Sequence, residues 1–103
     1  MLYKPDINIK RIMRLATIIE HSSDYDQGDI QHCICGKACK AWQGMFDPFW
    51  PPRTPSYERG QDILGLTKDQ AHDLFQTVET TPAKTARVLR HLATTGEVDW
   101  AIA

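Results

Sequence analysis

The apolar positions of the chain recur mostly at the spacing of an α-helix. Between residues 9 and 19 they fall at i, i+3, i+4, i+7 and i+10, which places them on one stripe of a helix. This predicted buried stripe consists of Ile9, Ile12, Met13, Ala16 and Ile19. Asp6 or Asn8 can cap the helix, because their side chains accept hydrogen bonds from its first backbone N–H groups. The same criterion predicts a second helix over residues 30–43.

Turn and cap residues mark three further helices. A short helix over residues 58–64 is expected to end at Gly65, since glycine readily adopts the left-handed conformation that closes a helix. Thr67 followed by Gln70 has the sequence pattern of a capping box, which predicts the start of the next helix. The last helix has a cap residue, a proline in its first turn and a glycine stop, which are Thr81, Pro82 and Gly96.

The segment DPFWPPRTPSY, residues 47–57, is not expected to form regular structure, because its prolines remove backbone donors and fix φ. We expect an ordered loop that its aromatic side chains hold over the core. The C-terminal tail is expected to fold back so that Val98 and Trp100 pack on the helices. No strand-like alternation of useful length is present. The predicted fold class is therefore all-α, a small bundle of about five helices with a proline- and aromatic-rich loop and a packed C-terminal tail.

Three segments of the chain carry a resemblance to other proteins. They are Cys33-Ile34-Cys35-Gly36, Leu64-Gly65-Leu66-Thr67 and Thr95-Gly96-Glu97-Val98-Asp99-Trp100. In these segments the chain resembles a loose group of uncharacterised bacterial and phage proteins that are small and helical. The resemblance implies a small helical fold and brings no activity with it. The group tends to have alanine where this chain has Cys35, so a metal site that uses Cys35 would be particular to this sequence.

The composition is that of an ordinary globular protein, and the length of 103 residues predicts a single domain, residues 1–103. The net charge of -1 argues against a protein whose main role is non-specific binding of nucleic acid. No apolar run reaches the roughly 18 residues that span a bilayer, and the N-terminus lacks the apolar segment of a secretory signal. We therefore predict a cytoplasmic protein without a membrane segment, and the odd count of 3 cysteines agrees with this.

All the cysteines lie in the segment HCICGKAC, residues 32–39, which raises the hypothesis of a zinc site. The candidate ligands are His32, Cys33, Cys35 and Cys39. Cys35 and Cys39 can share one face of a helix, whereas Cys33 and Cys35 are about 200° apart around it. One ion could bind all three thiols only if the helix starts after Cys33. The favoured alternative is that the thiols are small buried hydrophobic groups and that no cofactor is bound.

Residues 61–76 have the layout of a helix-turn-helix DNA-binding motif, with a Gly-Leu-Thr turn between two helices. The second helix of such a motif brings cationic and amide side chains to phosphates and base edges. Here that helix also carries Asp69 and Asp73, whose carboxylates would repel phosphate. A DNA-binding regulator is therefore an alternative, and nucleic acid is not the expected partner.

No catalytic motif is present: the chain has no paired carboxylates, phosphate-binding loop, nucleophile elbow or zinc-protease motif. We therefore expect a non-enzymatic accessory or protein-interaction domain, a monomer or homodimer, whose protein partner the sequence does not identify. Aromatic side chains of the proline-rich loop and a basic strip on the last helix are the candidate contact surfaces. Their residues are Phe49, Trp50, Lys84, Arg87, Arg90 and His91.

Overall fold

A computed structural model describes residues 8–26, 33–42, 57–76 and 80–101 of the chain. Within these ranges the chain forms five α-helices and no strand, which confirms the predicted all-α fold class. The helices are α1 (Ile9–Glu20), α2 (Ile34–Ala41), α3 (Tyr57–Leu64), α4 (Lys68–Phe75) and α5 (Pro82–Thr95). The proline- and aromatic-rich segment lies outside the described residues, apart from its last residue, Tyr57, which begins α3.

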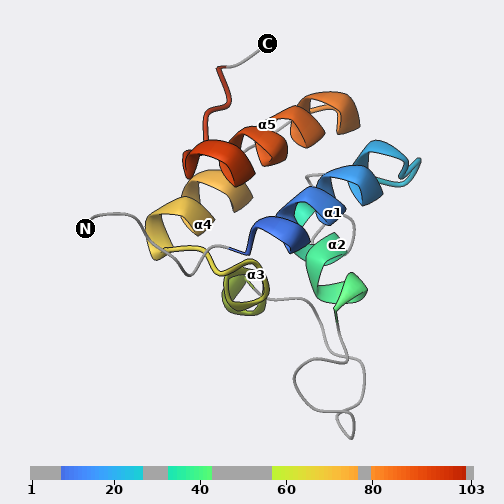
Figure 1. The fold of residues 1–103 in the computed structure, drawn as a ribbon. Coiled ribbons are helices and arrows are strands. Elements are labelled where there is room, and N and C mark those ends of the chain that lie inside the picture. Colours follow the sequence, from blue (N-terminus) through green and yellow to red (C-terminus); the bar gives the residue numbers. More distant parts are fainter. Residues whose placement is uncertain (1–7, 27–32, 43–56, 77–79, 102–103) are drawn as a thin grey trace, which may run out of the picture.

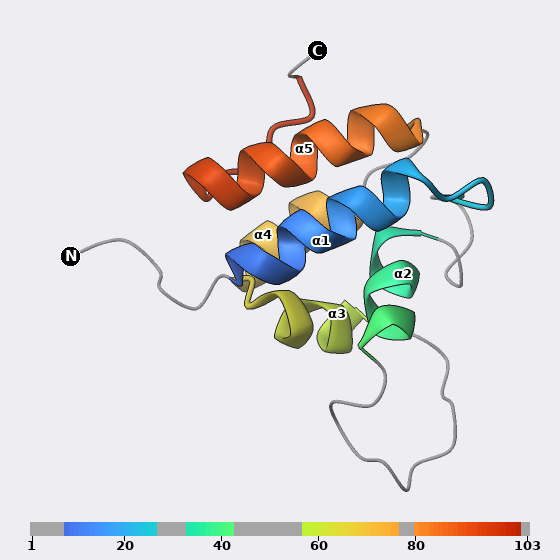
Figure 2. The ribbon, with the colours of Figure 1, turned by 45° about the vertical axis from the view of Figure 1, so that its right-hand side comes forward.

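Helix α1 is central to the arrangement. It lies side by side with α5, and the two helices run antiparallel (Figure 1 and Figure 2). On its other side α1 contacts α2 and α3, which also contact each other, and α4 packs on α2 and α3. Each of the other helices therefore packs on α1 itself or on a helix that contacts α1.

The buried side of α1 is rotated away from the predicted stripe. Its fully buried residues are Ile12, Leu15, Ala16 and Ile19. The prediction is wrong for Ile9 and Met13, whose exposed fractions are 47% and 39%. Leu15 belongs to the buried set, and including it moves the centre of the stripe away from Ile9 and Met13 by part of a turn.

The start of α1 is joined to the end of α3. Asn8, one of the two predicted cap residues, caps α1 by accepting a hydrogen bond from the Arg11 N–H at 3.0 Å. The Asn8 N–H itself donates to the Leu64 carbonyl at 2.9 Å, and Arg11 Nη1 donates to the Ile63 carbonyl at 2.9 Å. Two carbonyls at the end of α3 thus have partners, and a guanidinium lies at the negative end of the helix dipole.

Helix α3 ends where the sequence predicts, at Gly65. This residue has φ of 67°, a left-handed conformation that glycine adopts without steric cost. The Leu66 N–H donates to the Gln61 carbonyl at 3.0 Å, and the Gly65 N–H donates to the Asp62 carbonyl at 3.3 Å. This pair of bonds is a Schellman motif, and it turns the chain directly into α4.

The predicted capping box of α4 is present and has a second use. Thr67 Oγ1 accepts from the Gln70 N–H at 3.1 Å, and Gln70 Oε1 accepts from the Thr67 N–H at 2.8 Å. The same Gln70 amide donates through Nε2 to the Gly96 carbonyl at 2.7 Å. Gly96 is the predicted C-terminal stop of α5, with φ of 81°. One side chain therefore caps α4 and holds the end of α5.

The C-terminal tail packs on the helices, as predicted. Val98 and Trp100 are partly buried against the core. Trp100 Nε1 also donates to the Asp73 carbonyl of α4 at 2.9 Å. The predicted start of α5 is confirmed as well, since Thr81 caps it and Pro82 is its first residue.

Replacing Gln70 should destabilise the fold more than removing the cap residue alone. We expect Thr67→Ala to lower the free energy of unfolding by about 1 kcal/mol, the usual value of a cap. Gln70→Ala should lower it by about 2 kcal/mol, because it removes two hydrogen bonds that link α4 to its own turn and to α5. Urea unfolding followed by circular dichroism measures both values. Equal losses for the two variants would contradict the bridging role of Gln70.

Candidate functional site

The cysteine segment forms the buried helix α2. Cys33 is its N-cap, and its Sγ accepts a hydrogen bond from the Gly36 N–H at 3.5 Å. The helix therefore starts after Cys33, which is the geometry that the zinc hypothesis requires. Cys33, Cys35 and Cys39 are all free thiols and all buried. His32, the fourth candidate ligand, lies outside the described residues.

Cys35 lies at the contact between α2, α3 and α4. It is fully buried, and it hydrogen-bonds to the Cys39 thiol one helical turn away. A Cβ atom placed on Gly60 of α3 would be 3.1 Å from Cys35 Sγ and 3.0 Å from the ring of Phe75. Glycine at position 60 thus lets the two helices approach closely around the thiol.

The surroundings of Cys33 and Cys35 disfavour the ionised form of their thiols. The hydrogen bond with Cys39, together with burial, raises the pKa of Cys35 well above its usual range, and burial raises the pKa of Cys33. A thiolate is the form that acts as nucleophile or metal ligand. Among the described residues, no group of three or more His, Cys, Asp or Glu residues is placed to hold a metal ion. The zinc hypothesis, which includes His32, stays a prediction.

A buried lysine in the same helix was not expected from the sequence. Lys37 is buried, and its ammonium group pairs with the Asp24 carboxylate in the segment after α1. Next to it, the Tyr25 hydroxyl accepts a hydrogen bond from Thr85 Oγ1 of α5 at 3.0 Å, and burial raises the pKa of Tyr25 to about 12. These contacts tie the segment to α2 and α5. The available signal was the position of Lys37 between the apolar residues Cys35 and Ala38, whereas the other lysine of α2, Lys40, lies on its exposed side.

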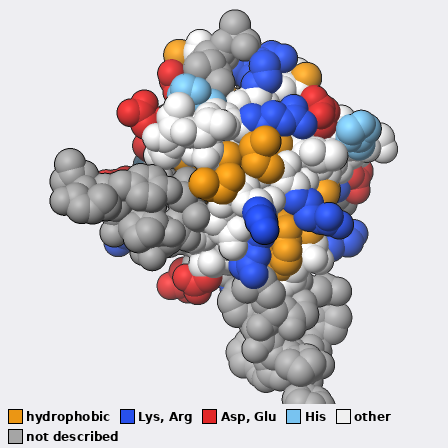
Figure 3. All heavy atoms as spheres, viewed as in Figure 1, with side chains coloured by type: hydrophobic (Ala, Val, Ile, Leu, Met, Phe, Trp, Pro, Cys, Tyr) orange, Lys and Arg blue, Asp and Glu red, His pale blue; other side chains and the backbone are white. Residues whose placement is uncertain are grey.

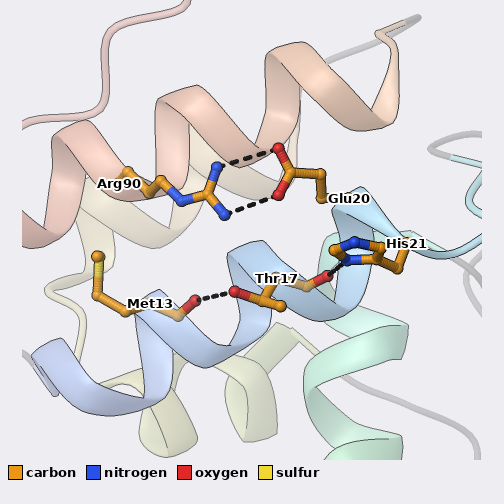
Figure 4. A network of polar contacts seen from close by, with 5 residues as sticks. All are labelled: Met13, Thr17, Glu20, His21 and Arg90. Carbon is orange, nitrogen blue, oxygen red and sulfur yellow. Dashed lines mark hydrogen bonds and ion pairs between the residues drawn. The ribbon is translucent and has the colours of Figure 1, made fainter.

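The predicted basic strip of α5 is divided between two flanks of the helix. Arg90 lies on the flank that faces α1, and Lys84 and His91 are about 100–120° further round. Arg87 lies between them and is exposed. Arg90 is paired: its guanidinium donates two hydrogen bonds to the Glu20 carboxylate of α1, at 2.8 Å and 3.2 Å (Figure 4). This contact lowers the pKa of Glu20.

Exposed apolar side chains lie on the same flank of α1 as this ion pair. Ile9, Met13 and Glu20 share the flank of α1 that faces α5, because they lie within about 40° of one another around the helix. Figure 4 shows the Met13 side chain pointing toward α5, on the same side as Arg90. Together with the neighbouring cations they form what we term the α1–α5 face. Its residues are Ile9, Lys10, Met13, Arg14, Arg87 and Arg90.

The α1–α5 face is strongly positive. Helices α1 and α5 contain six of the chain's 12 Lys and Arg residues and one of its 13 Asp and Glu residues, Glu20. Figure 3 shows Lys and Arg side chains gathered around exposed hydrophobic ones on this side of the molecule. Within the described part of the chain, no hydrogen bond or ion pair engages the side chains of Lys10, Arg14 or Arg87.

The predicted helix-turn-helix segment does form two helices joined by a tight turn. In α4, however, the Gln70 amide is bonded to Thr67 and Gly96, so it is not available to base edges. The exposed side chains of α4 include both acidic residues, Asp69 and Asp73. Its exposed surface is therefore mixed in charge.

The structure brings together only part of the predicted contact residues. Phe49 and Trp50 lie outside the described residues, so the loop prediction stays a prediction. Arg90 borders α1, and Arg87 is near enough to α1 to help lower the pKa of Glu20. Lys84 and His91 lie further round the helix. The sequence reasoning missed the exposure of Ile9 and Met13, and it did not name Lys10 or Arg14 as candidate contact residues. A signal existed in the pattern Ile-Lys-x-x-Met-Arg, which places two cations beside two apolar residues at i and i+4.

Comparisons with known proteins add no relatives: no protein-family model, curated protein or solved structure matches the chain significantly. The resemblance to small bacterial and phage proteins thus stays a prediction. In the described parts of the chain, no helix has the length and apolar character needed to cross a membrane.

The thiols should be protected in the folded protein. We expect all three to react with a disulfide reagent such as DTNB at least about 100-fold more slowly in native protein than in concentrated guanidinium chloride, because burial blocks access of the reagent to each thiol. Absorbance of the released thiol measures the rates. A thiol that reacts equally fast in the native and unfolded protein would contradict this and reopen a redox or metal-binding role.

Proposed function

We propose that this protein is a non-enzymatic protein-interaction domain and that it contacts its partner through the α1–α5 face. The observation that carries the proposal is the exposure of Ile9 and Met13 beside Lys10 and Arg14, whose side chains make no hydrogen bond or ion pair within the described residues. Methionine and arginine are among the residue types enriched at protein interfaces, and an apolar centre with a polar rim is their usual layout.

A protein partner fits this face better than nucleic acid does. Phosphate groups gain nothing from an apolar strip such as that of Ile9 and Met13, whereas a protein segment can cover it with its own apolar side chains. The alternative through α4 is weakened because Asp69 and Asp73 are exposed there and the Gln70 amide is already bonded. Both considerations favour a protein ligand.

A non-enzymatic role is supported by the state of the cysteines. The thiols are the chain's most reactive side-chain type, and here they are buried with a raised pKa at Cys33 and Cys35. They stabilise the contact of α2 with α3 rather than face a substrate. Three free thiols are also compatible with a reducing compartment, so a cytoplasmic location stays our prediction.

This function is tested by comparing which proteins bind to the immobilised wild-type chain and to variants of its surface. The chain is immobilised as wild type, as the Arg14→Glu/Arg87→Glu variant, and as Lys40→Glu/Lys68→Glu, a control with the same charge change on α2 and α4. We expect a protein from the native host's extract to bind the wild type and the control, and to be reduced at least about tenfold on the α1–α5 variant. Thermal melts verify that all three are folded.

Equal capture by all three forms would contradict the proposed face. A captured protein lost only from the control would move the interface to α2 and α4. Loss of captured nucleic acid, rather than protein, from the Arg14→Glu/Arg87→Glu variant would overturn the protein partner. Its loss from the variant that carries Lys68→Glu on α4 would favour the DNA-binding alternative through residues 61–76.

A further inference from the structure

Positive charge is concentrated in helices α1 and α5, and negative charge in the rest of the chain. Helices α1 and α5 together have a net charge of +5, while the whole chain has a net charge of -1. The remaining residues therefore carry -6. A face of this sign attracts an acidic ligand, and the acidic remainder of the molecule repels the same ligand from other surfaces. Charge complementarity thus selects both the ligand and the face.

The apolar strip adds a second requirement. Ile9 and Met13 are one helical turn apart, about 6 Å along the axis of α1. A helix that lies along the seam between α1 and α5 can match this spacing with apolar residues at its own i and i+4 positions. Its flanks would then reach the cations on both sides, Lys10 and Arg14 on one and Arg87 and Arg90 on the other.

The Glu20 carboxylate already occupies part of this face. It accepts both hydrogen bonds of the Arg90 guanidinium, the bidentate geometry in which a ligand carboxylate would bind. Glu20 is exposed, so the exchange of one carboxylate for another requires no opening of the core. The intramolecular pair is therefore a competitor that a ligand must displace to use Arg90.

We propose that the α1–α5 face binds an acidic amphipathic helix of a protein partner, with its apolar side on Ile9 and Met13 and its carboxylates on the flanking cations, and that Glu20 competes with it for Arg90. This inference rests on the proposed function and specifies the class of ligand. A ligand that binds by charge alone does not fit this proposal, because it would leave Ile9 and Met13 uncovered.

A display library of random 16-residue peptides, a length of about four helical turns, tests the proposal. Peptides are selected on the full chain and then synthesised, and their affinities are measured by fluorescence anisotropy. We expect the selected peptides to combine Asp and Glu with Leu, Ile or Phe at i, i+3 and i+4 spacing. Scrambled peptides of equal composition should bind at least about tenfold more weakly.

Three variants give the binding mode. We expect Arg14→Glu/Arg87→Glu and Met13→Ser each to weaken the selected peptides about tenfold. Glu20→Gln should strengthen them about two- to fivefold, because it removes the competing carboxylate and frees Arg90. Lys40→Glu on α2, which lies away from the face, should have little effect.

The outcomes separate this proposal from the proposed function. Selected peptides without acidic bias that still depend on Arg14 and Met13 would overturn the ligand class and leave the face intact. Peptides that ignore every variant of the face would overturn both. Tighter binding of duplex DNA or of anionic vesicles than of any peptide, lost in Arg14→Glu/Arg87→Glu, would overturn the protein partner itself.

Discussion

The structure depends on the burial of one side of α1 among α5, α2 and α3. Four residues of this helix are fully buried: Ile12, Leu15, Ala16 and Ile19. Among the described helices, α5, α2 and α3 contact α1 directly, and α4 contacts α2 and α3. Polar contacts then fix the position of the helix: Asn8 and Arg11 bind the end of α3, and Glu20 binds Arg90 of α5. Apolar burial stabilises the contact, and these bonds set its register.

Because its inner side is fixed in this way, α1 presents one outer side to solvent. That side has Ile9 and Met13 next to Lys10 and Arg14, and the antiparallel neighbour adds Arg87. The same helix therefore builds the core and supplies the surface that we propose binds a partner. The cysteines are part of the core, since every residue from Cys33 through Cys39 is buried.

Local signals in the sequence predicted the caps of α1, α4 and α5 well. The predicted start of the second helix at residue 30 was wrong, because Cys33 is extended and caps α2, which begins at Ile34. The cap at Asn8, the Thr67–Gln70 capping box and the stop at Gly96 each involve groups within a few residues of one another, so their patterns are visible in the chain. The long-range contacts were not predictable, because they require knowledge of which helices are neighbours. The pairing of Arg90 with Glu20 is one example, and it changes a basic strip into two flanks. The exposure of Ile9 and Met13 is another, since periodicity gives a stripe but not the position of its partners.

The most direct measurement is site-specific photo-crosslinking from the outer side of α1. A benzophenone amino acid replaces Met13 in one form of the chain and Lys40 in a control form, and crosslinked products from the native host are identified by mass spectrometry. The account predicts a product specific to position 13 whose crosslinked peptide belongs to a protein, is rich in Asp and Glu, and is lost on Arg14→Glu. Identical products from both positions, or a position-13 product that is nucleic acid or lipid, would contradict it.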